Sequence, residues 1–325
     1  MEASELLNRI TRAKRSQVDL HAYLFEVDPP LGALVNGCGS WLHLREWLQE
    51  FTPKGTNESR LLAANFCKKH LLCQSCAVRR AGKHVEAYAA KVEHLQKERP
   101  DLVPAMVTLT VKNGPDLPER VAHMKKAWSR MIAARRRYLS NPDRHPAVEW
   151  SKVEGSIRAI EIKRGKRSGL WHPHMHCFVL LDRYIKQKKL SEEWHQWTGD
   201  SFVVGVTKCK NGIVPGLIET VKYSCKFSSM TPDQIYYVHS TLTGSRLLDP
   251  QGCLRGVTVP SIDSDDISGL SGPYRDFIAT WLHGEQRYHL SEKWNGPLTF
   301  IRPGQLRTEA AHVSECDIGD AEVPF

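Results

Sequence analysis

Apolar positions recur with two different periods along this chain, and the periods predict helices and strands. Apolar residues return every three or four positions over 2–24 and over 77–96, so each stretch is predicted to form a helix. The β-branched run at 106–111 predicts a short buried strand instead. Another helix is predicted to begin near Pro118, because proline suits a first helical turn.

The middle of the chain predicts a β-hairpin. Residues 156–163 alternate as a strand, residues 171–181 are predicted to form the returning strand, and a glycine-containing turn separates them. Further predicted elements are a helix near 191–197, a strand near 202–207, a helix near 216–227 and a helix near 274–282. The acidic stretch 307–325 has few apolar residues and is predicted to be a flexible tail.

The composition is typical of a soluble globular protein, with 41% hydrophobic and 25% charged residues. The first residues form no apolar signal segment, and no run approaches the roughly 20 apolar residues that cross a bilayer. We therefore expect a cytoplasmic protein without a membrane partner. Because thiols stay reduced in the cytoplasm, the 9 cysteines are expected to be core residues or metal ligands rather than disulfides.

The net charge of +9 favours a polyanionic partner, and nucleic acid is the leading class. Charge alone leaves open that no nucleic acid binds. The cationic run Arg135, Arg136 and Arg137 lies on a predicted helix, where it forms either a solvated face or a contact with a DNA backbone.

The second strand of the predicted hairpin carries a candidate metal site. His174 and His176 alternate along a strand, so their imidazoles share one face and lie about 7 Å apart. A carboxylate from the preceding strand would complete a site for one cation, and Glu161 is the first choice, with Glu154 the second. His172 is either a nearby ligand or a phosphate contact.

Two other interpretations apply to this histidine strand. The pairing can be structural or fortuitous, as paired histidines often are. The run also resembles the start of a metallo-hydrolase motif, His-x-His-x-Asp-His, but Cys177 and Phe178 stand where that motif requires Asp and His.

The helix predicted near 216–227 carries Glu219 and Tyr223 on one face, because they are four residues apart. A phenol has an ordinary pKa near 10, so a nucleophilic Tyr223 needs positive charge nearby, from a cation or from Lys222 and Lys226. The alternative is an ordinary amphipathic helix in which the tyrosine ring packs and its hydroxyl meets water.

Cysteines in the N-terminal third have the spacing of metal ligands. Cys67, Cys73 and Cys76 lie close together, and Cys38 lies upstream in a glycine-rich turn. Such ligands suit tetrahedral Zn²⁺, and we favour these four cysteines over a set that contains His70. The alternative is a group of buried free thiols.

Together these segments resemble the rolling-circle plasmid replication initiators (Rep) of the HUH endonuclease superfamily, in the branch with one tyrosine and a Glu partner. The resemblance covers three motifs in order, from about residue 106 to 227. They are Val107-Thr108-Leu109-Thr110, the strand His172-Pro173-His174-Met175-His176, and Glu219 with Tyr223 in Val221-Lys222-Tyr223-Ser224-Cys225-Lys226.

The resemblance implies an α+β fold with a central antiparallel sheet, flanking helices and an N-terminal Cys-rich zinc-binding segment. The family often carries such a Cys-rich block before a basic pair, which Arg79-Arg80 matches here, although the cysteine spacing departs from the usual form. The implied segments are 1–37 helical, 38–100 Cys-rich with a helix, 101–230 the HUH nickase domain, 231–306 an accessory region and 307–325 the acidic tail.

The resemblance also implies an activity. Mg²⁺ or Mn²⁺ held by His174, His176 and Glu161 would polarise a scissile phosphate, and Tyr223 would attack it and keep the 5′ phosphate. Glu219 would then assist termination. Implied partners are plasmid origin DNA, as a hairpin or single-stranded nick site, and a host helicase and polymerase. Expected DNA contacts are Lys222, Lys226, Arg135, Arg136, Arg137, Arg79, Arg80 and His172.

Two other functions remain open from the sequence. One is a related HUH transposase or conjugative relaxase, although the pairing of Glu219 with a single tyrosine favours the initiator. The other is a non-enzymatic zinc-dependent DNA-binding regulator, which leaves the hairpin and the tyrosine helix unexplained. Host, origin sequence and oligomeric state are left open.

Overall fold

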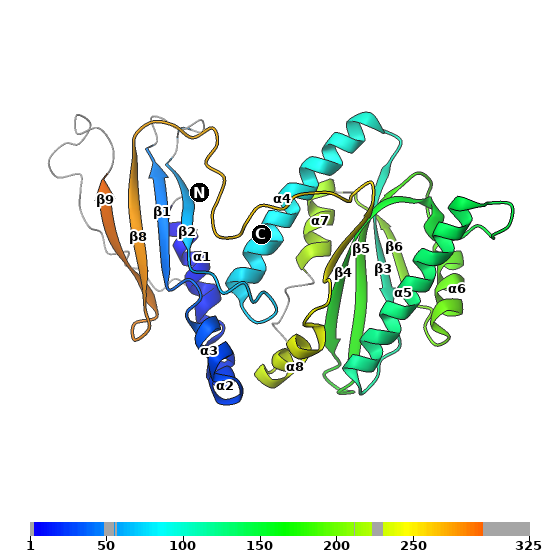
Figure 1. Cartoon of the computed structure of the whole chain (residues 1–325), viewed down its shortest axis with the longest axis horizontal. Coiled ribbons are helices and arrows are strands. Elements are labelled where there is room, and N and C mark those ends of the chain that lie inside the picture. Colours follow the sequence, from blue (N-terminus) through cyan, green and yellow to red (C-terminus); the bar gives the residue numbers. More distant parts are fainter. Residues whose placement is uncertain (1–2, 49–54, 56, 211, 223–229, 295–325) are drawn as a thin grey trace. The chain divides into compact units, whose positions relative to one another are not determined.

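The structure is a computed structural model that describes residues 3–48, 55, 57–210, 212–222 and 230–294 (Figure 1). The chain forms two compact units. One unit comprises Met1–Arg80 and Ser261–Phe325, and the other comprises Ala81–Pro260. The α+β class and the antiparallel sheets with flanking helices are confirmed, whereas the borders of the five predicted segments stay predictions. Among the described helices, none has the length and apolar character needed to span a membrane.

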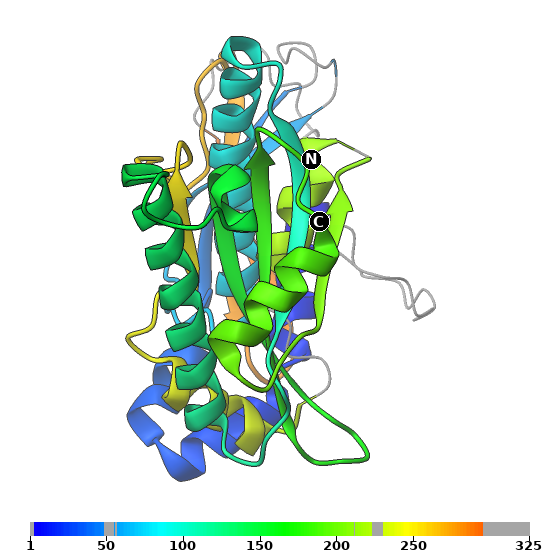
Figure 2. The ribbon, with the colours of Figure 1, turned by 90° about the vertical axis from the view of Figure 1, so that its right-hand side faces the viewer.

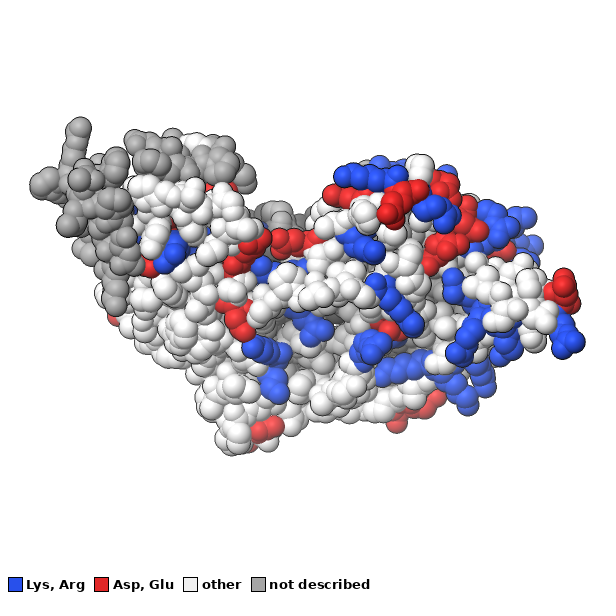
Figure 3. Space-filling view, turned by 45° about the horizontal axis from the view of Figure 1, so that its top comes forward, with Lys and Arg blue, Asp and Glu red and all other residues white. Residues whose placement is uncertain are grey.

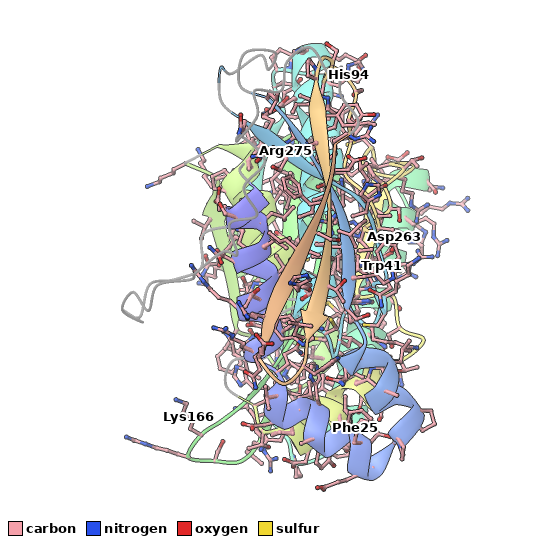
Figure 4. All side chains as sticks on the ribbon, turned by 90° about the vertical axis from the view of Figure 1, so that its left-hand side faces the viewer. Phe25, Trp41, His94, Lys166, Asp263 and Arg275 are labelled. Atoms are coloured by element: carbon pink, nitrogen blue, oxygen red, sulfur yellow. The ribbon has the colours of Figure 1, made fainter. Side chains whose placement is uncertain are left out.

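The first unit has a four-stranded antiparallel sheet in the order β2-β1-β8-β9. Figure 4 shows β8 and β9 at the front, and the labelled Arg275 lies on β8. Leu42, Leu44 and Leu61 are fully buried in this sheet's core. The unit's elements are α1 (Ala3–Arg15), α2 (Val18–Val27), α3 (Pro29–Asn36), β1 (Trp41–Trp47), β2 (Glu58–Ala64), β8 (Tyr274–Leu282) and β9 (Arg287–Trp294).

Two predictions for this unit were wrong. The helix predicted near 274–282 is strand β8, which pairs with β1 on one side and β9 on the other. Aromatic and β-branched residues favour strands, and Asp276, Ala279 and Trp281 are buried. The single helix predicted over 2–24 is two helices, since α1 ends at Arg15 and α2 begins at Val18.

The second unit has a five-stranded antiparallel sheet in the order β6-β3-β5-β4-β7, with β5 at its centre. Its strands are β3 (Val103–Thr110), β4 (Val153–Arg164), β5 (Trp171–Leu181), β6 (Val204–Lys208) and β7 (Leu248–Gly252). Its helices are α5 (Leu117–Ser140), a short 3₁₀ helix (Glu149–Lys152), α6 (Gln187–Thr198), α7 (Ile213–Lys222) and α8 (Pro232–Leu242). Helix α4 (Gln74–Glu98) contains the border between the units.

One face of this sheet is an apolar core under α5 and α6, which lie in front of the strands in Figure 2. Helix α5 begins where the Asp116 carboxylate accepts a hydrogen bond from the Glu119 amide at 2.8 Å. Trp128 of α5 meets Trp150 edge-on at 5.3 Å between ring centroids. Trp194 of α6 donates its ring N–H to the Thr110 carbonyl at 2.8 Å.

Helix α7 packs on the other face of the sheet. The Thr220 hydroxyl lies 3.2 Å from the sulfur of Met106 on β3. Gly216 permits this approach, because a Cβ there would lie 2.7 Å from the Cys209 sulfur and 3.3 Å from the Phe178 ring. Met106 and Phe178 are cross-strand neighbours, so α7 covers the polar face of the sheet near one end.

Candidate active site

The histidines lie on the α7 face of the sheet's central strand. Alternation along β5 places His172, His174 and His176 on this face, while Met175 and Cys177 point into the fully buried core on the other side. The ring centroids of His172 and His174 are 4.1 Å apart, and those of His174 and His176 are 6.0 Å apart. A row of three imidazoles thus runs along the central strand of the sheet.

The acid chosen from the sequence lies in the same row. Glu161 of β4 pairs directly with His174 of β5, and its side chain is 2% exposed. Its Oε2 atom lies 2.9 Å from Nε2 of His176 and 3.1 Å from Nζ of Lys163. The second choice, Glu154, lies at the far end of β4, where the strand pairs with Leu180 and Leu181.

Two threonines of β3 hold the opposite edges of the imidazole rings. The Thr110 hydroxyl lies 3.0 Å from Nδ1 of His174, and the Thr108 hydroxyl lies 3.3 Å from Nδ1 of His176. The register places each threonine beside its histidine. The sequence gives these residues no role beyond membership of a motif; the detectable signal is a Thr-x-Thr strand with the same alternation as His-x-His.

Burial and local charge set the protonation of this row. Burial, followed by the neighbouring His172, lowers the pKa of His174 to about 3, so its imidazole is neutral at physiological pH. Burial alone would raise the pKa of Glu161, but the hydrogen bond with His176 and the charge of Lys163 bring it below its ordinary value. The site therefore offers a neutral imidazole and an ionised carboxylate, which are the forms that bind metals.

These residues fit a divalent cation chemically. The Oε1 atom of Glu161 is buried and has no hydrogen-bond partner within the described residues, which leaves a carboxylate oxygen for a ligand. Nitrogen and oxygen donors suit Mn²⁺, and Mg²⁺ accepts the carboxylate. The side chains would need to draw closer to share one ion, because in the described part of the chain only a cluster of thiols brings three or more ligand atoms within 4.8 Å.

Helix α7 leads from this face toward the predicted nucleophile. Glu219 lies on α7 and is half-buried, next to Thr220, which is fully buried against the sheet. Lys222 is the last residue of α7. Tyr223 and Lys226 lie outside the described residues, so their predicted roles as nucleophile and DNA contact stay predictions.

The four cysteines favoured from the sequence form one cluster in the first unit. Their ligand atoms lie within 4.8 Å of one another. The Cys38 sulfur is 3.4 Å from that of Cys73 and 3.5 Å from that of Cys76, and Cys67 is 3.6 Å from Cys76. His70 instead accepts a hydrogen bond from Arg80 at 3.1 Å. The cluster has the composition of a tetrahedral zinc site.

The thiols share their protons unequally, as expected of crowded ligands. Hydrogen bonds from Cys38 and its neighbours hold the pKa of Cys67 well below the ordinary value, and the hydrogen bond with Cys38 raises that of Cys73. Lys14, a residue outside the predicted sites, is 6% exposed and donates to the Cys38 carbonyl at 2.5 Å. Burial lowers the pKa of Lys14, while the adjacent thiols oppose that shift.

Some of the side chains predicted to contact DNA already bind other residues of the protein, and others are exposed. Arg79 binds Asp265 at 2.8 Å, and Arg135 donates to the Val153 carbonyl at 2.6 Å. Arg136 and Arg137 are exposed on α5. In Figure 3, Lys and Arg side chains are distributed over the surface of the second unit, with acidic side chains between them. The DNA-binding roles stay predictions.

Comparison with known proteins places the chain in a family. Residues 58–269, more than half of the chain, match the family described as Replication protein (Rep_1). "Protein rep" of Streptococcus pneumoniae serotype 2 (strain D39) is 25% identical over 80% of this chain and 85% of its own length. "Protein rep" of Staphylococcus aureus is 24% identical over 60% of this chain and 82% of its own length. No solved structure matches significantly. The chain therefore belongs to the replication protein family of plasmid rolling-circle initiators, as its three motifs predicted.

Proposed function

We propose that this chain nicks one DNA strand at a plasmid origin through Tyr223, with His174, His176 and Glu161 holding a divalent cation. The observation that carries the proposal is the direct pairing of Glu161 with His174 on the face of the sheet that α7 covers. Because α7 ends at Lys222, Tyr223 follows directly from a helix packed on that face.

Two ligands of the proposed cation, His174 and Glu161, have shifted pKa values. The lowered pKa of His174 keeps its lone pair available, and the lowered pKa of Glu161 keeps its carboxylate charged. When bound, Mg²⁺ or Mn²⁺ would withdraw charge from the scissile phosphate and stabilise charge that develops on it. Lys163, 3.1 Å from Glu161, adds a positive charge at the same edge of the site.

The nicking step exchanges one phosphate ester for another. The Tyr223 oxygen forms a bond to phosphorus, and the bond from phosphorus to the 3′ oxygen of the preceding nucleotide breaks. The phenol proton passes to Glu219 or to water, and the leaving oxygen takes up a proton to become a 3′ hydroxyl. A host polymerase would extend that hydroxyl behind a host helicase, while the phosphotyrosine conserves the bond energy for rejoining.

Glu219 has a second proposed role at the end of the round. It lies on α7, four positions before Tyr223 in the sequence, and its carboxylate would activate a water or assist a second transfer. A water activated in this way would hydrolyse the bond between Tyr223 and the 5′ phosphate and release the protein from the DNA. The energy of that bond is then no longer available for rejoining.

The cysteine cluster is proposed to hold a structural Zn²⁺ in the first unit. Its four ligands are all sulfur atoms from this chain, so no position is left for substrate. We therefore assign the cluster a role in folding, separate from nicking, in a protein that acts on plasmid DNA in the cytoplasm.

The test is a nicking assay with a supercoiled plasmid that carries the cognate origin, in the presence of Mn²⁺ or Mg²⁺. The parent protein should produce nicked circles with covalently attached protein, and Tyr223→Phe should produce neither. Tyr237→Phe, an exposed tyrosine of α8, is the matched control and should nick normally.

Nicking by Tyr223→Phe at the parental rate would overturn the nucleophile assignment. A covalent adduct formed only at transposon ends or a transfer origin would favour the transposase or relaxase. Origin binding without any nicking would favour the regulator.

A further inference from the structure

The Thr-x-Thr pair of β3 contacts the histidines in a repeated way. Thr110 meets His174 and Thr108 meets His176, each through the hydroxyl and each at Nδ1. Both threonines are half-buried on the same face as the histidines. Two equivalent contacts two residues apart indicate one function for both, rather than a chance contact of one side chain.

We propose that Thr108 and Thr110 are positioning residues that hydrogen-bond to Nδ1 of His176 and His174, so that Nε2 of each ring faces the cation and Nδ1 carries the proton once the cation is bound. An imidazole binds a metal through an unprotonated nitrogen, and the hydrogen bond at the other nitrogen decides which one that is. This inference rests on the proposed function, because it concerns the ligands of the same cation.

A hydroxyl suits this task better than other polar groups. Nε2 of His176 faces Oε2 of Glu161 at 2.9 Å, which without a cation is a hydrogen bond donated by Nε2–H. Nδ1 of a neutral His176 then accepts a hydrogen bond from the Thr108 hydroxyl. When a cation takes Nε2, the proton resides on Nδ1, and the same hydroxyl accepts instead, since it rotates to donate or accept.

The contacts also restrain ring rotation. The rings are attached to the central strand, and each is held at Nδ1 by a neighbouring strand whose register is set by a continuous ladder from Val103 to Thr110. A ring fixed at one edge loses less rotational entropy when its other edge binds a cation. Both effects predict weaker cation binding when the hydroxyls are removed.

A purely structural role makes a different prediction. Valine has the shape of threonine and favours strands, so Thr108→Val and Thr110→Val preserve packing while they remove the hydroxyl. Serine keeps the hydroxyl and loses the methyl group. If the threonines only fill space, the serine variants should be impaired and the valine variants should not.

The experiment measures Mn²⁺ binding to the full chain without DNA, by calorimetry and by electron paramagnetic resonance. We expect each valine variant to bind Mn²⁺ about 10–100-fold more weakly, the range typical for loss of a hydrogen bond that supports a ligand. The serine variants should bind within a few-fold of the parent. Thr207→Val, an exposed threonine of the edge strand β6, is the matched control and should not change binding.

Nuclear magnetic resonance of ¹⁵N-labelled histidine reads the tautomers directly. At a Mg²⁺ concentration that half-saturates the parent, the parent should carry more of the Nδ1–H tautomer of His174 and His176 than the valine variants, which bind the cation more weakly and keep more protons on Nε2. A parent that binds Mn²⁺ and nicks through Tyr223, with valine variants that match it in affinity and tautomer, overturns this inference alone. A parent that binds no Mn²⁺ overturns both this inference and the proposed function.

Discussion

Glu161 and His174 are direct cross-strand neighbours, and both lie on the one face of the central strands that α7 covers. This pairing connects an acid and an imidazole that are 13 positions apart through a single hairpin, so the candidate site is built largely within one local element. Local hairpins form early and tolerate little register change, because a shift by one residue would turn Glu161 to the other face.

Glu161→Gln should weaken Mn²⁺ binding by about 100-fold or more, because it removes the charge of a ligand, and losing only a ligand's hydrogen-bond partner costs about 10–100-fold. Nicking should fall in parallel, as measured with the supercoiled origin plasmid. Glu154→Gln, at the far end of β4, serves as the comparison. A larger loss in Glu154→Gln than in Glu161→Gln would show that the wrong carboxylate has been assigned.

The cysteine cluster should hold about one Zn²⁺ per chain, because four sulfur ligands complete a tetrahedral site. Cys76→Ser should lower the zinc content, measured by mass spectrometry of the metal, and should reduce the free energy of unfolding, since a structural zinc contributes its binding energy to folding. Cys253→Ser, outside the cluster, should retain the zinc. Full zinc content in Cys76→Ser would be incompatible with this ligand set.

Gly216→Ala should slow nicking while leaving DNA binding nearly intact. A Cβ at this position would lie 2.7 Å from the Cys209 sulfur and 3.3 Å from the Phe178 ring, so α7 and these side chains must shift relative to one another. We expect part of that shift to displace the helix that precedes Tyr223. A displacement of about 1 Å in a reacting group can cost about 10²-fold in rate.

Gly82→Ala is the matched control for this substitution, because it also lies within a helix but a Cβ there meets no atom within 4 Å. It should leave nicking unchanged and raise the free energy of unfolding by up to about 1 kcal/mol. Equal nicking rates for both alanine variants would show that the close approach of α7 is not needed.

Acid should destabilise the protein in part through His21. Burial, followed by the positive charge of Lys14, lowers the pKa of His21 to about 4 from its ordinary 6.5. Between these values the unfolded chain binds a proton that the folded chain does not, so the free energy of unfolding falls as the pH falls from 6.5 to about 4. His21→Gln should flatten this dependence in urea unfolding at several pH values, whereas His289→Gln, an exposed residue of β9, should not.

The elements of the second unit were easier to predict than those of the first because their patterns are simpler. Strand β5 has the bounds predicted for it, since histidines alternate with other residues up to His176 and an unbroken, buried apolar run from Cys177 to Leu181 continues the strand. Strands β1 and β8 instead carry charges within the sheet: Arg45 binds Asp276 at 2.8 Å, and Arg275 binds Glu46 at 2.8 Å. Such cross-strand ion pairs obscure the alternation in either strand when it is considered alone.

Some residues of the candidate site could be predicted from the sequence and others could not, and the distinction is again physical. The position of Glu161 beside the histidines could be predicted, because a hairpin determines which residues of its two strands are neighbours. The contacts of Thr108 and Thr110 could not, because β3 and β5 are separated by α5 and β4, and their register depends on the assembled sheet. Lys14 was missed for a related reason: its partner is a backbone carbonyl, which leaves no trace in the sequence.

Strand β1 pairs on one side with β2 and on the other with β8, which is synthesised more than two hundred residues later. During translation, the whole segment Ala81–Pro260 is synthesised before β8, so the first unit, which needs β8, is the last to be completed. Until then β1 has an exposed edge that other nascent chains can pair with. A protein shortened before Tyr274 therefore retains the sheet with the histidines but keeps this edge open, and it should aggregate even where its second unit folds.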